Sequence, residues 1–241
     1  MAKHGKKYRA AQEKIVPQEL YEPRRALELA KETSLSKFDG TIEIHLRLGV
    51  DPRHAEEQIR EMVQFPHGLG KSVRVVAFAE GDDARLAQQA GADFIADDEL
   101  IDRIQKGWTD FDATVATPSM MGKAGRLGKI LGPRGLMPNP KAGTVVPGQD
   151  LPRVIKELKA GRVEFRSDKS ANLHVPIGKA SFGTEMLYDN MAALMDVVKR
   201  ARPASAKGNY IRKVVVTSTM GPGVKVDPTA AQAMELGADR N

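Results

Sequence analysis

One short run, Val73-Arg74-Val75-Val76-Ala77-Phe78-Ala79, is β-branched and almost wholly apolar. Such a run is typical of a strand that is covered on both faces of a parallel sheet. The segment Asp82 to Ala90 then predicts a helix, with acidic residues at its start and Gly91 placed to end it. The alternation repeats along Phe94-Ile95-Ala96, a helical stretch near Asp98 to Lys106, and Ala113-Thr114-Val115-Ala116. Residues 73–116 therefore predict a βαβ layer structure.

The sequence on both sides of this region alternates strictly instead. Thr41 to Leu48 places four aliphatic side chains on one face of a strand and Glu43, His45 and Arg47 on the other. The same pattern returns at 162–166 and 172–177, where Pro176 favours an edge position. A long helix from about Thr184 to Ala201 and a last strand from Tyr210 to Thr217 follow. These strands predict a sheet with one face exposed.

A further helix is expected after the first alternating strand. Asp51-Pro52 has the residue types of an N-cap and a first helical position. The apolar stripe of this helix would consist of Ala55, Ile59, Met62 and Val63.

The expected fold class is α/β with two domains. One strand in the N-terminal segment cannot bury itself, so it needs the C-terminal half of the chain. Residues 1–67 and 161–241 would form a discontinuous α+β domain, with a half-exposed sheet and helices behind it. Residues 68–160 would be an inserted three-layer, Rossmann-like α/β domain. Gly68, Gly70 and Gly161 mark the crossings and are expected to act as hinges.

Composition excludes several functional classes. The chain has 241 residues and no cysteine, which removes disulfides, thiolate metal sites and thiol nucleophiles. The five histidines are dispersed, so neither a metal nor another cofactor is expected. The longest stretch without a charged residue, Val214 to Val224, is too short for a membrane span, and no secretory signal opens the chain. We expect a cytoplasmic protein that is not an enzyme and contacts no membrane.

A nucleotide-binding enzyme is the first rival hypothesis, because Gly68-Leu69-Gly70-Lys71-Ser72 ends like a P-loop. The motif needs a glycine where this chain has Phe65, and it must lead into a helix. Here it leads into the predicted strand at Val73. Nucleotide binding at this position is therefore not supported.

A second unusual segment, Ala113 to Gly148, is rich in glycine and proline and contains no acidic residue. It is a candidate secondary RNA contact, since its basic side chains could hold phosphates. The alternative is a short helix from Gly122 to Ile130 and a loop in which Gly and Pro serve backbone geometry only. Its basic residues are Lys123, Arg126, Lys129, Arg134 and Lys141.

Charge favours nucleic-acid binding outside the insert. The net charge is +6, but residues 72–160 hold 12 basic and 12 acidic groups, so the whole surplus belongs to the outer domain. Aromatic residues are only 5%, which disfavours base stacking on the sheet. The alternative to nucleic-acid binding is that the basic residues lie on a solvated face and on a frayed N-terminus. The basic residues concerned are Lys3, Lys6, Lys7, Arg9, Lys14, Arg47, Arg162, Arg166 and Lys169.

Four segments together resemble a known family. They are Phe65-Pro66-His67-Gly68-Leu69-Gly70-Lys71, Gly135-Leu136-Met137-Pro138-Asn139-Pro140-Lys141-Ala142-Gly143-Thr144-Val145, Gly178-Lys179-Ala180-Ser181-Phe182 and Thr217-Ser218-Thr219-Met220-Gly221-Pro222. In these strings and their order, the chain is similar to the bacterial L-one family of large-subunit ribosomal proteins. The resemblance covers nearly the whole chain and leaves out only the Ala-rich tail from Thr229.

The resemblance implies a function as well as a fold. The outer domain would bind large-subunit rRNA, and the insert would move with the ribosomal stalk and assist release of deacylated tRNA from the exit site. Members also resemble repressors that bind their own operon mRNA, which is an alternative or additional function. The free protein is expected to be a monomer.

The resemblance also implies the residues that contact rRNA. They are Lys37, Phe38, Arg53, Arg166, Asp168, Lys169, Thr217, Thr219, Met220 and Gly221. Many members carry Phe-Arg-Asn-Asp-Lys-Thr-Gly where this chain has residues 165–171, so Ser167, Ser170 and Ala171 depart from the pattern. Chemically, Lys37 can meet phosphate, threonine hydroxyls can bond ribose, and Gly221 allows close approach of RNA to the backbone. Met220 offers an adaptable apolar contact.

Overall fold

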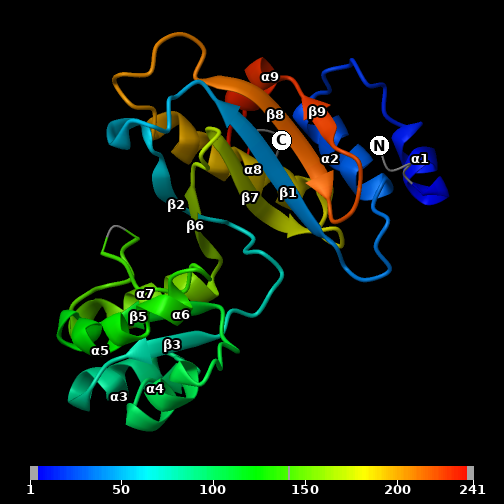
Figure 1. Ribbon diagram of the computed structural model, residues 1–241. Helices are drawn as coiled ribbons and strands as arrows, with labels where there is room; N and C mark the ends of the chain where they lie inside the picture. The colour runs from blue at the N-terminus through cyan, green and yellow to red at the C-terminus, as the bar shows by residue number, and fades with distance from the viewer. Residues whose placement is uncertain (1–4, 141, 238–241) are drawn as a thin grey trace. The chain divides into compact units, whose positions relative to one another are not determined.

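A computed structural model describes residues 5–140 and 142–237 of the chain (Figure 1). The chain divides into two compact units. Unit 1 combines the chain up to Gly70 with the chain from Val163 onward, and unit 2 is Lys71–Arg162. The boundaries expected at 67/68 and 160/161 differ from these by two or three residues.

Unit 1 contains a four-stranded antiparallel sheet in the order β7-β1-β8-β9. Its central strand β1 comes from the N-terminal segment and lies between two strands of the C-terminal half (Figure 1). The sheet strands are β1 (Thr41–Leu48), β7 (Asn172–Lys179), β8 (Ile211–Ser218) and β9 (Val224–Val226). Pro176 lies on the edge strand β7, as its missing N–H predicts.

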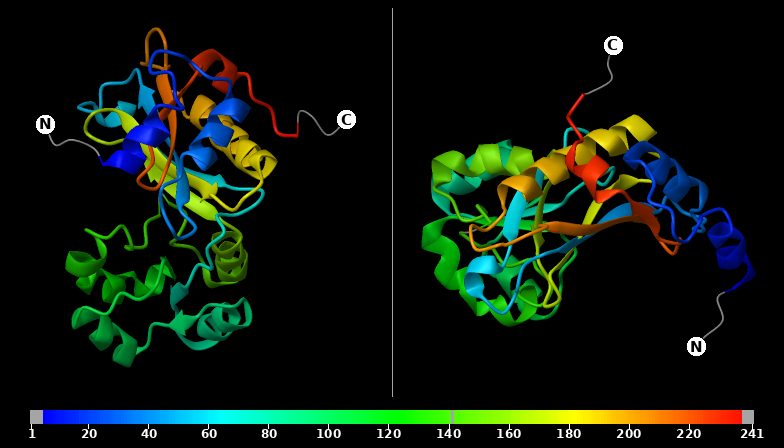
Figure 2. Two further views of the ribbon diagram at one scale, coloured as in Figure 1. Left: turned by 90° about the vertical axis from the view of Figure 1, so that its right-hand side faces the viewer. Right: turned by 90° about the horizontal axis from the view of Figure 1, so that it is seen from above.

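Two helices cover one face of this sheet, α2 (Pro23–Glu32) and α8 (Thr184–Arg200), as the views of Figure 2 show. Ile42, Ile44, Leu46 and Leu48 of β1 are buried beneath them, which confirms the strict alternation seen in the sequence. The other face of β1 carries polar side chains that are half-buried or exposed. Unit 1 also contains α1 (Lys6–Gln12), the 3-10 helix η1 (Ala55–Glu57), β2 (Arg60–Gln64), β6 (Arg162–Arg166) and α9 (Pro228–Gln232).

The helix expected from Asp51 onward is wrong. The chain forms only η1 there and then strand β2, which pairs with β6. Ile59, Val63 and Phe65 are buried while Arg60 and Gln64 are exposed, which is the period-2 pattern of a strand. The strand predicted from Tyr210 to Thr217 is also not the last one, because β9 follows it.

Unit 2 is built on a three-stranded parallel sheet in the order β4-β3-β5. All four residues of β3 are buried, and they alternate between two apolar clusters on the two faces of the sheet. This confirms the strand predicted to be covered on both faces. Its elements are β3 (Val75–Phe78), α3 (Gly81–Gln89), β4 (Phe94–Ile95), α4 (Asp98–Gln105), β5 (Ala113–Ala116), η2 (Pro118–Met120), α5 (Met121–Arg126), α6 (Gly128–Leu131), η3 (Gly148–Asp150) and α7 (Leu151–Lys159).

Helix starts and stops in unit 2 follow the sequence signals. The carboxylate of Asp97 accepts a hydrogen bond of 2.8 Å from the backbone N–H of Leu100 and so caps α4. The consecutive acidic residues Asp97, Asp98 and Glu99 are thus the N-cap and first turn of α4. Gly91 has φ +95° just after α3, a conformation that stops a helix and favours glycine.

Candidate nucleic-acid interface

The turn at the end of β8, residues 217–222, presents an exposed apolar side chain on a strained backbone. Met220 has φ +63°, a conformation that non-glycine residues rarely adopt, and its side chain is 78% exposed. A backbone N–H of Gly221 donates 2.8 Å to the carbonyl oxygen of Ser218 and closes the turn. We call residues 217–222 the Met220 turn. Its geometry holds Met220 outward rather than against the core.

The Met220 turn is fixed to the start of β1 by hydrogen bonds. Thr219 N–H donates 2.9 Å to the carbonyl oxygen of Thr41, and Thr41 N–H donates 2.9 Å to Thr219 Oγ1. Thr217 Oγ1 donates 3.2 Å to the carbonyl oxygen of Gly221. Both predicted threonines therefore shape the turn with the same hydroxyls that were expected to meet RNA.

Gly221 is required by packing inside the turn. A Cβ at this position would lie 2.3 Å from Ser218 Oγ and 3.3 Å from the carbonyl oxygen of Thr33. The room made by the missing side chain is thus filled by the chain itself. Close approach of RNA is not needed to explain this glycine.

The loop before β1 lies beside the Met220 turn. A Cβ at Gly40 would lie 3.4 Å from Thr219 Cβ, so the loop and the turn are in contact. The Asp39 carboxylate fixes the loop by accepting bonds of 3.0 Å from Ser181 N–H and 2.7 Å from Ser181 Oγ. The bond from the Ser181 hydroxyl, against a smaller effect of burial, holds the pKa of Asp39 below its usual value.

This loop exposes the predicted pair Lys37 and Phe38. The Phe38 side chain is 67% exposed, and Lys37 next to it is also exposed. The structure therefore brings a cation and two exposed apolar side chains, Phe38 and Met220, to one end of the sheet. This arrangement suits a partner that carries phosphates and apolar sugar or base faces.

A second tight turn, residues 168–172, lies at the other end of β1. The Asp168 carboxylate accepts 2.7 Å bonds from the N–H groups of Ser170 and Asn172, and a 3.1 Å bond from Asn172 Nδ2. Burial raises the pKa of Asp168, but these hydrogen bonds outweigh it and keep the pKa below its usual value. We call residues 168–172 the Asp168 turn. Asp168 serves to build this turn, while Lys169 in it is exposed.

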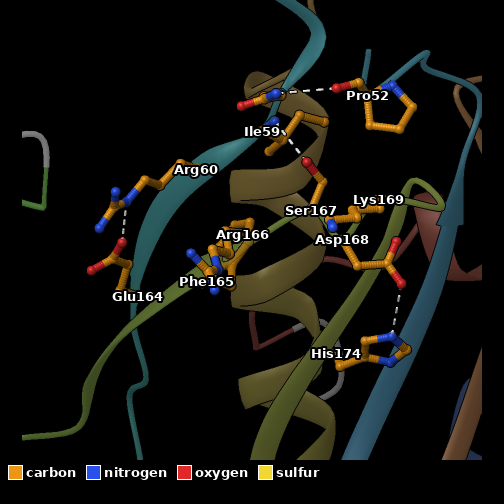
Figure 3. Close-up of a pocket in the computed structure, with 11 residues that line it drawn as sticks. Pro52, Ile59, Arg60, Glu164, Phe165, Arg166, Ser167, Asp168, Lys169 and His174 are labelled. Carbon is orange, nitrogen blue, oxygen red and sulfur yellow. Dashed lines mark hydrogen bonds and ion pairs between the residues drawn. The ribbon is translucent and has the colours of Figure 1, made fainter. Parts of the chain in front are cut away.

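The Asp168 turn borders an open cleft of about 680 Å³ between strands β2, β6 and β7 (Figure 3). An Arg60–Glu164 ion pair bridges β2 and β6 on one side of it. On the other side, Asp168 Oδ2 lies 3.6 Å from His174 Nε2, and Figure 3 shows the two side chains pointing toward each other. Arg166 and Lys169 also line the cleft. Arg53 is exposed on the neighbouring loop but does not line the cleft.

An uncovered polar face connects the two turns. The register pairs Glu43 with Thr217 and Pro176, His45 with Val215 and His174, and Arg47 with Lys213 and Asn172. Directly paired side chains share a face, so these residues form one surface, which we call the open face. The Met220 and Asp168 turns lie near its two ends, separated by roughly 20 Å at the rise of an antiparallel strand.

Residues 30–222 match the Ribosomal protein L1p/L10e family. The chain belongs to this family. It is 59% identical to the Large ribosomal subunit protein uL1 of Chloroflexus aurantiacus over 236 residues, which is 98% of this chain and 100% of the relative. It is 57% identical to the protein of the same name from Chloroflexus aggregans over 98% of this chain and 100% of the relative. The corresponding protein of Mycobacteroides abscessus is 54% identical over 95% of this chain and 96% of the relative.

Family membership makes the chain a ribosomal protein, associated with ribosomes in the cytoplasm, and confirms the resemblance found in its sequence. It also confirms a mixed α/β fold with several sheets. In the described ranges 5–140 and 142–237, no helix has both the length and the apolar composition needed to cross a bilayer. The same ranges contain no group of three or more side chains placed to hold a metal ion.

The open face also carries an imidazole, His174, and an ammonium group, Lys213, that were not among the predicted contact residues. His174 and Lys213 belong to strands far from β1 in sequence, and only the register places them beside His45 and Arg47. The alternation of β7 and β8 could have identified them as outward-facing. Their partners on β1 could not be read from the sequence, because several registers satisfy the same alternation.

In the basic segment of unit 2, the structure pairs one of the basic residues with carboxylates and leaves three others exposed. Lys123 donates 2.6 Å to Glu80 and 3.2 Å to Asp98, and these bonds, the one to Glu80 first, raise its pKa. The positive charge of Lys123 is thus paired with carboxylates of unit 2 itself. Arg126, Lys129 and Arg134 are exposed on or after α5 and α6. The helical alternative fits residues 121–131, and Lys141, like Lys3 of the N-terminal arm, lies outside the described residues.

The predicted hinge glycines adopt conformations that favour glycine. Gly68, Gly70 and Gly161 have φ of +62°, +68° and +103°. A Cβ at Gly70 would also lie 2.7 Å from the ring of Phe182. The P-loop-like segment at these positions leads into strand β3, so it has no helix N-terminus with which to hold a phosphate.

Proposed function

We propose that this L1p/L10e protein is a structural, non-catalytic component of the large ribosomal subunit that binds large-subunit rRNA through unit 1. The observation that carries the proposal is the Met220 turn, where a strained backbone presents an exposed methionine beside Phe38 and Lys37. Such strain costs roughly 1–3 kcal/mol and persists where the surrounding structure imposes it, often at binding sites. The relatives are proteins of the large ribosomal subunit, which supports the same partner.

The mode of binding follows from the side chains at the two turns. Lys37 and Lys169 would contact phosphates, and Met220 and Phe38 would contact sugar or base faces. Thr217, Thr219 and Asp168 would act by holding the turns in shape. Phe165 is buried and cannot serve as a stacking platform. Recognition would therefore depend on RNA shape and on the spacing between the two turns.

Met220→Asp tests this proposal. We expect the variant to bind a transcript of the stalk region of large-subunit rRNA at least about tenfold more weakly, equivalent to about 1.4 kcal/mol, because it replaces the apolar contact to a sugar or base face by a carboxylate that the negatively charged RNA repels. Filter binding over a salt series measures the change. Leu236→Asp is the matched control, since Leu236 is also an exposed apolar residue of unit 1. Equal affinity of wild type and Met220→Asp would refute the site.

We also propose that unit 2 is the inserted Rossmann-like domain and that it moves about the glycine hinges with the ribosomal stalk. Its parallel three-stranded sheet with apolar clusters on both faces supports this assignment. In this role it would assist release of deacylated tRNA from the exit site, with Arg126, Lys129 and Arg134 as a secondary RNA contact. Ribosomes that carry the Arg126→Glu/Lys129→Glu variant should release exit-site tRNA more slowly in a stopped-flow assay. An unchanged rate would refute the contact.

Repression of its own operon mRNA is the additional function that we propose. A surface that recognises phosphate spacing and shape would accept any RNA folded like the rRNA site. Leader mRNA and the rRNA transcript should then compete for the free monomer, and Met220→Asp should weaken both complexes alike. Simultaneous binding of the two RNAs would contradict a shared site.

A further inference from the structure

The open face contains a close pair of histidines. His45 on β1 and His174 on β7 are directly paired across the strands, their Nδ1 atoms lie 2.8 Å apart, and their ring centroids are separated by 5.0 Å. A hydrogen bond between two Nδ1 atoms requires one ring to donate and the other to accept. Two doubly protonated rings cannot make it, because both Nδ1 atoms would then carry hydrogens. The pair therefore holds either no extra proton or one.

The neighbouring carboxylates assign the hydrogens of the neutral pair. Asp168 Oδ2 lies 3.6 Å from His174 Nε2, and its carboxylate stays ionised, so the Nε2 atom of His174 carries the hydrogen. His174 Nδ1 is then the acceptor and His45 Nδ1 the donor. This leaves His45 Nε2 without a hydrogen, 4.0 Å from the Glu43 carboxylate. An added proton would go to His45 Nε2.

Charged groups from each strand around His45 set the balance for that proton. Glu43 on β1 favours it, whereas Arg47 on β1 and Lys213 and Lys225 on β8 and β9 share the open face and oppose it. Burial first, and then His174, lower the pKa of His45, against the smaller effect of Glu43. In the free protein the pKa of His45 therefore lies below its usual value, and a further anion beside Nε2 would raise it.

We propose that His45 and His174 form a proton-linked binding site for an RNA phosphate on the open face, so that RNA binding takes up a proton. This rests on the proposed function, because the phosphate belongs to the rRNA held between the two turns. An approaching phosphate replaces water beside the pair and favours the charged form of His45. The resulting imidazolium keeps its bond to His174 as a charge-assisted hydrogen bond and donates to the phosphate through Nε2.

The sign of the pH dependence follows from linkage. Binding raises the pKa of His45 above its value in the free protein, so the added affinity is fully present below the free pKa. It is lost as the pH rises through the pKa of the complex. If the shift is about one unit, affinity for RNA falls by about tenfold across this range.

Titration calorimetry of the full chain with the stalk-region transcript tests the proposal. Binding enthalpies in cacodylate, MES and imidazole buffers, which differ in ionisation enthalpy, give the protons taken up per complex. For a pKa shift of about one unit, we expect wild type to take up at most about half a proton per complex, at a pH between the pKa values of the free and the bound state, and His45→Gln to take up none. His54→Gln, which removes an exposed histidine of unit 1, should behave as wild type. Circular dichroism melting shows that each variant is folded.

Glu43→Gln tests the proposal through the pH of proton uptake, which would not change if the histidine pair had only a structural role. It removes the carboxylate beside His45 Nε2, so the pH of greatest proton uptake should move downward. Wild-type binding without proton uptake, or equal uptake by His45→Gln, would overturn the proposal and leave the proposed function standing. Failure of the wild-type chain to bind the transcript would overturn both.

Discussion

The Met220 turn and the Asp168 turn use the same backbone conformation for different ends. Met220 has φ +63° and Ala171 has φ +58°, and both positions would suit glycine sterically. The Met220 side chain is 78% exposed, whereas Ala171 is 2% exposed. The strained residue of one turn is thus exposed to solvent, and that of the other fills space in the core. Packing can offset the strain at Ala171 but not at Met220, and under the proposed function the strain at Met220 is retained for RNA binding.

The largest effect on stability is expected from the polar anchor of the Asp168 turn. Asp168→Ala removes three hydrogen bonds to Ser170 and Asn172. At about 1 kcal/mol for each bond, and allowing for partial exposure, unfolding should become easier by about 2 kcal/mol. Urea denaturation measures this change, and Lys169→Ala, which makes none of these bonds, is the control. A loss below about 0.5 kcal/mol would show that the turn does not depend on Asp168.

The same carboxylate predicts a pH dependence. Because the pKa of Asp168 is lowered by folding, its stabilising contribution is present above the unfolded value of 3.8 and is lost as the pH falls through the folded value. Wild type and Asp168→Ala should therefore converge in stability below pH 3.8. A constant difference down to the acid transition would contradict this assignment.

Met220→Gly should separate binding from stability. It relieves left-handed strain of about 1–2 kcal/mol and raises the entropy of the unfolded chain at a cost of about 0.5–1 kcal/mol. The exposed side chain contributes little burial, so the protein should gain about 0.5–1 kcal/mol while rRNA affinity falls. Thermal melting and filter binding on one preparation measure both. A variant that binds as tightly as wild type would refute the role of this side chain.

Ala171→Gly should have the smallest effect. The relief of strain is similar, but the variant also loses a buried methyl group worth about 0.8 kcal/mol. The terms nearly cancel, so stability should change by less than about 1 kcal/mol with rRNA affinity unchanged. A marked loss of affinity in the same two assays would mean that the Asp168 turn contributes through its backbone shape.

The sequence was sufficient for elements that carry a strict pattern. The alternating strand at 41–48 is where it was predicted, and the buried strand at 75–78 lies within the run predicted at 73–79. The helix expected after Asp51 failed because Ile59 and Val63 are four residues apart, an even spacing that suits a strand as well as a helix turn. The three residues of β9 carry too little pattern to be recognised.

The candidate site could be predicted only in outline. The motif at 217–222 and the pair Lys37 and Phe38 could be named from the resemblance, but their contact through Gly40 depends on the fold. The pairing of His45 with His174 joins residues 129 positions apart and needs the register of β1 with β7. The sequence also could not show that Thr217, Thr219 and Gly221 serve the turn itself.

The central claim is that the Met220 turn and the loop at Phe38 touch the same stretch of large-subunit rRNA. Photo-crosslinking from a benzophenone side chain at position 220, 38 or 236 in the complex with this RNA tests it directly. The account predicts crosslinks from positions 220 and 38 to one short region of the RNA, and none from position 236. Crosslinks equally strong from position 236, or none from positions 220 and 38, would contradict it.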